Sequence, residues 1–327
     1  MQKILVEIVG YLILAPLYAI GILPLKFQYL LSNVFVYLPL RLIGYRRKII
    51  LGNISSAFPT MSLRAVKNTA KTFYHFLADV LAESLWLFAV GEKRARKHCT
   101  IENAQILSGY CGKSVIIVLG HYGNWEYLKF WADINLDSAI APYPHNVAVI
   151  YKAPRTELSH LLTVKMRQPR DTQWTPARDA HGNVKRSLIL VEHKEAAMFM
   201  FKHRHEEWLY FFIADQSPKP GAKFHTQFLN HDTFFFNGPE VLARKFHLPV
   251  LYYVHNRVKR GVYSCSFTPI TDNPDKIEEG YITKRFAQLL EADITNQPAF
   301  WLWSHKRWYR KLEKMYAAIG ETYQNNY

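Results

Sequence analysis

Apolar side chains dominate the first forty positions of the chain. Residues 8–25 carry no charge, and after Lys26 a second uncharged run covers residues 27–40. A membrane-spanning helix needs about 20 apolar residues, which the first run nearly provides. Four residues that weaken a straight helix fall inside this region: Gly10, Pro16, Gly21 and Pro24. The pattern is compatible with a kinked span, an embedded interfacial hairpin or a buried pair of core helices. A cleaved signal peptide fits poorly, because no small-residue cleavage site closes a short apolar segment.

Helical and extended patterns then follow one another. Residues 62–89 place apolar side chains at spacings of three and four behind a potential Ser62 cap, which predicts an amphipathic helix. Residues 114–119 are rich in β-branched side chains, which predicts a strand buried on both faces. Gly120 ends this strand, and residues 124–131 resume a helical pattern. A strand, a tight turn and a helix in this order present loop side chains at the carboxyl edge of an α/β sheet.

The rest of the chain alternates between strand and helix patterns. Strands are expected at residues 147–151, 209–214, 250–255 and 263–268. Helices are expected at residues 155–166, 187–192, 239–246 and 277–294. This alternation favours an α/β sheet domain. Since the sequence has no internal repeat and no linker rich in Gly, Ser or Pro, one domain behind the N-terminal segment is the most economical division.

Composition and charge narrow the class of partner. The 327 residues are 49% hydrophobic and carry a formal charge of +15, which suits an anionic partner, either nucleic acid or a phospholipid surface. Arg41 and the basic run 46–48 directly follow the apolar region, and the positive-inside tendency would keep them cytoplasmic. Residues 301–308 mix aromatic and basic side chains, as membrane interfaces and nucleic-acid sites both do, while core packing of the tryptophans is a third interpretation. The apolar N-terminus favours lipid.

Patterns typical of metal or nucleotide sites are weak. The three cysteines, Cys99, Cys111 and Cys265, are widely spaced and show no zinc-ligand or redox spacing, so we interpret them as reduced thiols. His203 and His205 lie in a charged stretch and are interpreted as solvated. Gly-rich phosphate fingerprints are missing as well. We therefore expect no metal and no organic cofactor.

The strongest local candidate for chemistry is the segment from His121 to Glu126. When a hydroxyl attacks a thioester its proton must be removed, and imidazole accepts protons near neutral pH. A carboxylate on the other ring nitrogen would fix the tautomer, and the intervening glycine lets the loop bring Glu126 back to His121. A structural histidine is the alternative interpretation, but the place directly after a buried strand favours function. Because a Gly-x-Ser-x-Gly elbow is missing, a covalent acyl-enzyme has little support.

Short motifs recur in a fixed order along nearly the whole chain. They are Gly44-Tyr-Arg-Arg-Lys48, Asn53 with Ala57-Phe-Pro59, Gly120-His-Tyr-Gly-Asn-Trp-Glu126, Tyr151-Lys-Ala-Pro-Arg155, Ala214-Asp-Gln-Ser-Pro218, Phe228-Leu-Asn230, Gly238-Pro-Glu240, Leu248-Pro-Val250 and Trp301-Leu-Trp-Ser-His-Lys-Arg-Trp308. Each motif is modest, but their order and spacing are specific. With them the chain resembles the lipid A biosynthesis late acyltransferases, a branch of the lysophospholipid acyltransferase superfamily.

The resemblance implies roles for individual positions. His121 and Glu126 match the family's catalytic pair of a histidine and an acid five residues later. Two basic positions fall where the family binds the acceptor's phosphate or the oxyanion, and an Asp-Gln block lies close to the active site. The expected substrate-binding residues are therefore Lys152, Arg155, Asp215, Gln216 and Asn124. From the residues alone, the alternative interpretations are a helix cap or turn former for Asp215 and a solvated surface charge for Arg155.

The resemblance also implies the architecture and the reaction. We expect a mixed central sheet flanked by helices, like that of glycerolipid acyltransferases, with residues 1–48 as a membrane-anchoring helical segment and residues 49–327 as the catalytic domain. The implied reaction moves a fatty acyl chain from an acyl carrier protein thioester to a hydroxyl of a lipid A precursor, in lipopolysaccharide biosynthesis at the cytoplasmic face of a bacterial inner membrane. The expected partners are acyl carrier protein, that lipid and the membrane, with no nucleic acid.

Two departures from the superfamily pattern affect the choice of acceptor. The Pro-Glu-Gly-Thr-Arg-like block of the glycerolipid acyltransferases is absent, which disfavours phosphatidic acid synthesis. Ser217 and Pro218 follow the Asp-Gln block, where many lipid A enzymes have a more glycine-rich continuation. The main alternative is acylation of another envelope lipid, an aminolipid or a glycolipid. A thioesterase and a non-catalytic membrane scaffold are further alternatives.

Overall fold

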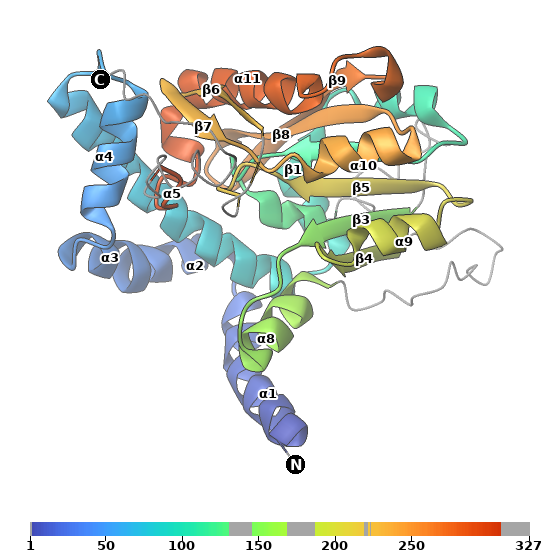
Figure 1. Ribbon diagram of the computed structural model, residues 1–327. Helices are drawn as coiled ribbons and strands as arrows, with labels where there is room; N and C mark the ends of the chain where they lie inside the picture. The colour runs from blue at the N-terminus through green and yellow to red at the C-terminus, as the bar shows by residue number, and fades with distance from the viewer. Residues whose placement is uncertain (1, 131–145, 169–186, 219–221, 223, 309–327) are drawn as a thin grey trace.

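The chain forms an α/β body with a helical N-terminal part, as expected (Figure 1). The computed structural model describes residues 2–130, 146–168, 187–218, 222 and 224–308. The strands are β1 (Cys99–Ile101), β2 (Val115–Leu119), β3 (Asn146–Tyr151), β4 (Ser187–Glu192), β5 (Trp208–Ile213), β6 (His225–Phe228), β7 (His231–Phe234), β8 (Val250–Lys259) and β9 (Val262–Thr271). The α-helices are α1 (Gln2–Gly21), α2 (Leu25–Ser32), α3 (Leu38–Leu42), α4 (Arg47–Ala57), α5 (Leu63–Ala89), α6 (Glu92–Ala95), α8 (Glu157–Arg167), α9 (Ala196–Lys202), α10 (Gly238–Phe246) and α11 (Tyr281–Asn296).

Short helical turns connect several of these elements. They are the π-helix η1 (Asn33–Tyr37) and the 3₁₀ helices η2 (Arg96–His98), η3 (Ala104–Tyr110), η4 (Trp125–Phe130), η5 (Pro274–Lys276) and η6 (Pro298–Phe300). Because η1 lies between α2 and α3, the three form an almost continuous helical segment that packs beside α5.

The central sheet has seven strands in the order β1-β9-β8-β2-β5-β3-β4. The five strands from β8 to β4 run parallel, while β9 is antiparallel to β8 and carries β1 parallel to itself at the edge. The pair β6–β7 forms a separate hairpin. The mixed sheet that we expected is therefore confirmed.

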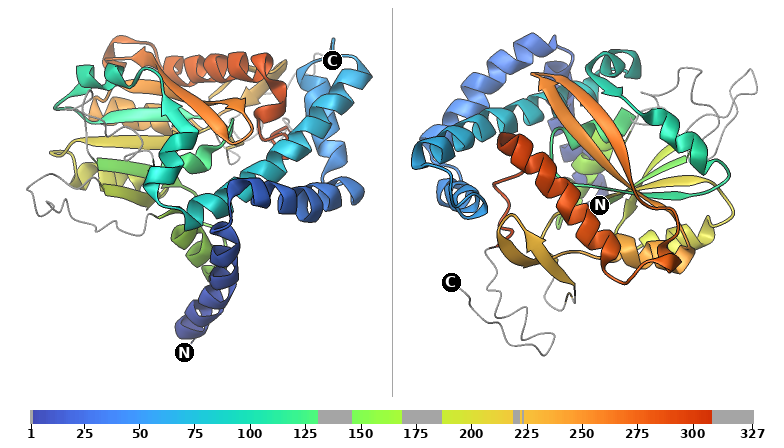
Figure 2. Two further views of the ribbon diagram at one scale, coloured as in Figure 1. Left: turned by 180° about the vertical axis from the view of Figure 1, so that it is seen from behind. Right: turned by 90° about the horizontal axis from the view of Figure 1, so that it is seen from above.

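Both faces of the sheet are covered, as the alternation of β2 illustrates. Ile116 and Val118 point into one buried cluster, which includes residues of α9, α10 and α11. Ile117 and Leu119 point into the other, which includes the C-terminal end of α5. Figure 2 shows α11 lying along one side of the sheet. Every residue of β2 is buried, as the β-branched run predicts.

Helix α5 joins the N-terminal helices to the sheet. The Ser62 hydroxyl accepts a hydrogen bond from the Ala65 amide and caps the helix, which confirms the predicted helix over residues 62–89. The helix contacts α1, α2, α4 and α8, and its apolar face reaches both clusters of the core. Helix α5 therefore packs against both the N-terminal helices and the core of the sheet domain.

The N-terminal helix α1 extends away from the body, with α8 beside it (Figures 1 and 2). It runs unbroken through Pro16. Gly10 and Gly21 admit close neighbours, because a Cβ at these positions would lie 2.5 Å from the Leu161 side chain and 2.4 Å from the Leu85 carbonyl oxygen. Residues 4–21 are long and apolar enough to cross a membrane, and only 17% of them are buried.

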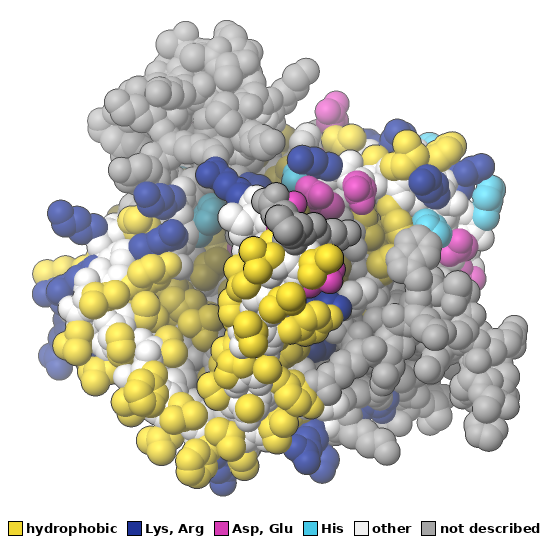
Figure 3. Space-filling model, turned by 90° about the horizontal axis from the view of Figure 1, so that it is seen from below, with side chains coloured by type: hydrophobic (Ala, Val, Ile, Leu, Met, Phe, Trp, Pro, Cys, Tyr) yellow, Lys and Arg dark blue, Asp and Glu magenta, His cyan; other side chains and the backbone are white. Residues whose placement is uncertain are grey.

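Exposed apolar side chains continue from α1 onto the neighbouring helices. Seen from below, hydrophobic side chains gather over this face, with Lys and Arg around its rim (Figure 3). Those that are more than half exposed include Ile4, Leu5, Ile8, Leu12, Phe27, Leu30, Phe35, Leu42 and Ile43. This apolar surface is far larger than scattered exposed residues would produce.

One predicted element is wrong and three strands were not predicted. Residues 187–192, predicted as a helix, form β4, because a short run of four apolar residues looks alike in a buried strand and in a helix. The edge strand β1 and the hairpin β6–β7 are too short for a periodic signal. The other predicted strands and helices agree with the structure to within four residues at each end, residues 124–131 corresponding to the 3₁₀ turn η4.

Candidate active site

The site lies where two neighbouring parallel strands end. In the register of β2 and β5, Leu119 is opposite Ile213, and the Ala214 amide donates to the Leu119 carbonyl at 3.0 Å. His121 follows the end of β2 by two residues, and Asp215 follows the end of β5 by two. The sheet therefore sets these two side chains next to each other although they are 94 residues apart in sequence.

Asp215 fixes His121 through both the ring and the main chain. Its Oδ1 lies 2.6 Å from His121 Nδ1, and its Oδ2 accepts from the His121 amide and from the Trp301 indole, each at 2.8 Å. Burial alone would raise the pKa of Asp215, but the charge of His121 and these hydrogen bonds outweigh it and hold the pKa well below its usual range. At neutral pH Asp215 is thus a carboxylate, which requires the proton on Nδ1 and leaves Nε2 as a base.

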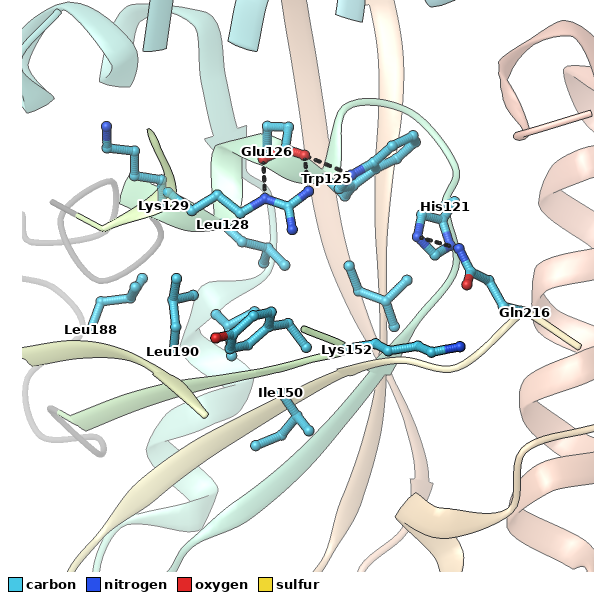
Figure 4. Close-up of a pocket in the computed structure, with 14 residues that line it drawn as sticks. His121, Trp125, Glu126, Leu128, Lys129, Ile150, Lys152, Leu188, Leu190 and Gln216 are labelled. Carbon is cyan, nitrogen blue, oxygen red and sulfur yellow. Dashed lines mark hydrogen bonds and ion pairs between the residues drawn. The ribbon is translucent and has the colours of Figure 1, made fainter. Parts of the chain in front are cut away.

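The second ring nitrogen of His121 faces the pocket. Gln216 Nε2 lies 3.3 Å from His121 Nε2, so the amide donates to the unprotonated nitrogen (Figure 4). The His121 side chain is 14% exposed, in contrast to the 3% of Asp215. One ring nitrogen is therefore anchored by Asp215, and the other borders the pocket, where a ligand hydroxyl would replace the Gln216 amide as its donor.

Glu126 does not hold His121, which corrects the contact expected from the sequence. Both of its carboxylate oxygens pair with Arg167 of α8, Oε2 with Nε at 2.9 Å and Oε1 with Nη2 at 2.5 Å. Trp125 lies between the two expected partners (Figure 4). Its indole donates to Glu126 at 3.0 Å, and its ring packs edge-on against the His121 imidazole, with the ring centroids 4.9 Å apart. Asp215 has the place on Nδ1 that the sequence pattern predicted for Glu126.

Arg167 was not predicted as a site residue. It ends α8, and the charge of Glu126 raises its pKa, so the two form a bidentate ion pair at the pocket. Nothing in the local sequence around Arg167 marks it, because its partner lies 41 residues away and is brought near only by the packing of α8.

The pocket is lined by both polar and apolar side chains. Its volume is about 300 Å³, and the polar lining includes His121, Glu126, Arg167, Lys152 and Gln216. The apolar lining includes Leu128, Val149, Ile150, Leu188, Leu190 and Ile213 (Figure 4). The pocket thus places a base beside a hydrocarbon-compatible wall.

A second cavity of about 410 Å³ adjoins the first. Both are lined by Lys152 and Gln216, and the second continues toward Phe212, Phe235 and Phe236. Two cavities that meet beside one histidine suit a reaction with two substrates.

The other predicted site residues divide into two groups. Lys152 and Gln216 line both cavities, and their role in substrate binding stays a prediction. Asn124 is fully buried, donates to Glu83 at 2.7 Å and accepts from the Glu126 amide at 3.0 Å, so it positions the loop from behind and does not face a substrate. Arg155 is exposed on the loop after β3 and is not among the residues that line either cavity.

Glu83 of α5 is a buried acid that the sequence did not reveal. It accepts hydrogen bonds from Tyr29, Tyr263 and Asn124 at 2.6, 2.7 and 2.7 Å. Burial raises its pKa, against the opposing effect of these donors. Glu83 thereby ties the loop that carries His121 to α2, α5 and β9.

The C-terminal aromatic segment completes the site. Trp301 and Trp303 are buried, so core packing, one of the three interpretations of this stretch, describes both. Leu302 donates its amide to the His121 carbonyl at 3.2 Å, and Arg307 donates to the Asp215 carbonyl at 2.8 Å. The C-terminal segment therefore holds both the loop after β2 and the loop after β5.

Metal-ligating side chains are grouped elsewhere. Within the described ranges, three such side chains have ligand atoms that all lie within 4.8 Å of one another: Cys99, His255 and Cys265, on β1, β8 and β9. None of these residues lines the cavities beside His121.

Comparison with protein families gives one result that covers almost the whole chain. The model of a family described as bacterial lipid A biosynthesis acyltransferase matches residues 2–310. A search of curated proteins finds no match. The matched range includes both strands that carry the site, the helices that hold it and the C-terminal segment that closes it.

Proposed function

Because the chain belongs to the bacterial lipid A biosynthesis acyltransferase family, we propose that it transfers a fatty acyl chain from an acyl carrier protein thioester to a hydroxyl of a lipid A precursor. The observation that carries this proposal is the oriented imidazole of His121, anchored by Asp215 at 2.6 Å and open toward an apolar-lined pocket. The lipid acceptor, the donor and the residue roles given below are part of the proposal.

His121 acts as the general base. Its Nε2 removes the proton of the acceptor hydroxyl while the hydroxyl oxygen attacks the thioester carbonyl carbon. The resulting imidazolium is stabilised by the Asp215 carboxylate on Nδ1. When the tetrahedral intermediate collapses, the carbon–sulfur bond breaks and the imidazolium gives its proton to the leaving thiolate. The base is thereby regenerated and no covalent enzyme intermediate forms.

Donors around the pocket stabilise the developing oxyanion. Lys152 and Gln216 line both cavities where they meet, so an ammonium and an amide are available at the reacting centre. Arg155, exposed on the loop after β3, suits the acceptor's phosphate, since guanidinium groups bind phosphate in a bidentate manner.

Glu126 contributes through its neighbours. Its pair with Arg167 closes one side of the pocket, and its bond to the Trp125 indole fixes the ring that packs on His121. Glu126 therefore remains an active-site residue in the proposal, acting on His121 by way of Trp125.

Association with the membrane and with acyl carrier protein follows from surface chemistry. We propose residues 1–48 as the anchor and residues 49–327 as the catalytic domain, since α1 and the apolar face beside it suit a bilayer (Figure 3). The basic run 46–48 next to this face would keep the body on the cytoplasmic side of the inner membrane. A chain with formal charge +15 also favours an acidic carrier protein.

The decisive experiment is a transfer assay with the full chain in detergent micelles. Radiolabelled acyl carrier protein is offered with a lipid A precursor, an aminolipid, a glycolipid or no acceptor, and products are separated by thin-layer chromatography. We expect label in the lipid A precursor with the wild type and a loss of about 10³-fold or more with His121→Ala. Label in another lipid alone would replace the acceptor, and free fatty acid without acceptor would identify a thioesterase. Unchanged transfer by His121→Ala would overturn the mechanism.

A further inference from the structure

Three side chains with metal-ligand chemistry meet inside the sheet, on the strands β1, β8 and β9. Cys99, His255 and Cys265 are 2%, 1% and 0% exposed. The two sulfur atoms lie 3.4 Å apart, and all three ligand atoms lie within 4.8 Å of one another. His255 is directly opposite Cys265 in the antiparallel pair of β8 and β9. The sheet register itself therefore creates this cluster.

His255 lacks the polar partners that a buried histidine normally has. Among the described residues, neither ring nitrogen of His255 has a hydrogen-bond partner. A buried polar group without a partner is unfavourable, and most such groups in proteins are bonded. The His255 imidazole is thus enclosed beside two thiols, a set of donor atoms that suits a metal ion.

We propose that Cys99, His255 and Cys265 form a buried binding site for one thiophilic d¹⁰ metal ion, Zn²⁺ or Cu⁺. Both ions accept thiolate and imidazole ligands. Sulfur ligands about 2.3 Å from a tetrahedral zinc ion lie about 3.8 Å apart, so the observed 3.4 Å requires only a small opening. Two thiolates neutralise the charge of Zn²⁺, which suits the apolar surroundings.

The strand register argues against a disulfide. In the parallel pair of β1 and β9, Cys265 is opposite Ile101, two residues from Cys99. Neighbouring strands about 4.8 Å apart and a shift of two residues separate the two Cα atoms by about 8 Å. A disulfide requires less than about 7 Å, so it would need movement of the backbone. A metal ion bridges the sulfur atoms without that movement.

A metal ion at this site would link the edge strand β1 to its neighbour β9, behind the active-site loop. β1 has only three residues, and two thiolates on one ion would hold it to β9. Gly123, two residues after His121, packs against the His255 backbone: a Cβ at Gly123 would lie 1.9 Å from the His255 carbonyl oxygen. The proposed role is structural and does not depend on the acyltransfer reaction.

Metal content tests the proposal directly. The full chain is purified in detergent under reducing conditions with an affinity tag that contains no histidine, and zinc and copper are measured by inductively coupled plasma mass spectrometry. We expect about one ion of one of the two metals per chain. The combined variant Cys99→Ser with Cys265→Ser should lose it. Cys111→Ser, which removes the third cysteine of the chain outside the cluster, should retain it.

A second measurement on the wild type keeps the test valid should the double variant fail to fold. Cobalt(II) added to the metal-stripped, reduced chain should give a thiolate-to-cobalt charge-transfer band that zinc abolishes. Metal content well below one ion per chain together with no such band would overturn the proposal. The proposal would also be overturned if intact mass and alkylation showed a disulfide bond between Cys99 and Cys265, with Cys111 as the only reactive thiol.

Discussion

His121 follows one strand of the central sheet and His255 lies within another, and the two side chains have opposite surroundings. His121 lies just beyond β2, is 14% exposed, and has Asp215 on one ring nitrogen and Gln216 near the other. His255 lies within β8, is 1% exposed, and has no hydrogen-bond partner on either nitrogen among the described residues. A base that turns over must be oriented and accessible, whereas a ligand that holds an ion must be enclosed. One sheet thus offers the imidazole that we propose as the general base at its carboxyl edge, called the reactive histidine below, and an enclosed imidazole in its interior.

The largest expected effect separates the two candidate partners of the reactive histidine. Asp215→Asn should lower kcat by about 10³–10⁴-fold, because an amide favours the wrong tautomer of His121. Glu126→Gln should cost much less, since Glu126 reaches His121 only through Trp125. Initial rates of acyl transfer measure both, with circular dichroism as a check of folding. An equal loss with Glu126→Gln would show that the contact predicted from the sequence forms during the reaction.

The second expected effect concerns Gly123, where the loop of His121 packs against the backbone of His255. Gly123 has φ = 62°, and a Cβ there would meet the His255 carbonyl, a backbone atom that cannot move aside. Gly123→Ala should therefore destabilise the protein by about 3 kcal/mol or more, from strain and overpacking. Gly52→Ala is the matched control, since Gly52 lies in α4 with nothing within 4 Å of its added Cβ, and should be neutral or slightly stabilising. Urea unfolding in detergent measures both variants, and equal midpoints would contradict the close packing.

The reactive region was largely foreseeable because its signals are local. The buried strand before His121, the turn at Gly120 and the Ser62 cap of α5 all follow from neighbouring residues. Resemblance to a known family added Asp215 and Gln216 to the site. What it did not give is which acid contacts which base, because that depends on β2 and β5 being neighbours in the sheet.

The cluster of Cys99, His255 and Cys265 could not be predicted from the sequence, because it also depends on which strands are neighbours in the sheet. Cys99 and Cys265 are 166 residues apart, and only the neighbouring positions of β1 and β9 bring them together. Their spacing in sequence led us to interpret them as separate thiols. Arg167 and Glu83 are similar cases, since each acts through a partner on a different element. Sequence patterns identify residues on one element well, but pairs across elements require the topology.

A third effect tests Glu83 as the link between the two regions. Glu83 accepts from Asn124 on the loop of His121 and from Tyr263 on β9, two residues before Cys265. In Glu83→Gln one acceptor oxygen becomes a donor that faces other donors, which should cost about 1–3 kcal/mol of stability. We also expect a drop of roughly 10-fold in kcat, which corresponds to about 1.4 kcal/mol in the barrier. The reason is that Asn124, on the loop of His121, depends on Glu83 as its acceptor. Glu192→Gln is the control: its pair with Lys194, at 3.9 Å, is partly exposed and should contribute less than about 0.5 kcal/mol. A variant Glu83→Gln as stable and active as this control would remove Glu83 from the link.

The smallest expected effect concerns a third histidine, His305, near the reactive one. Burial lowers its pKa to about 4, although the charge of Asp215 opposes this shift. In the unfolded chain the pKa is about 6.5, so between pH 6.5 and 4 the unfolded state binds more protons. The contribution of His305 to stability should therefore fall as the pH is lowered through this window and level off below pH 4.

His305→Gln should flatten part of this slope, and only part, because His75 and His231 also have pKa values lowered by burial. Urea midpoints between pH 7.5 and 4.5 measure the change. Asp215 cannot account for a slope in this window, since its lowered pKa moves the loss of its contribution to pH values below the usual carboxylate range. An unchanged slope in His305→Gln would show that the burial of His305 does not set the acid sensitivity of the fold.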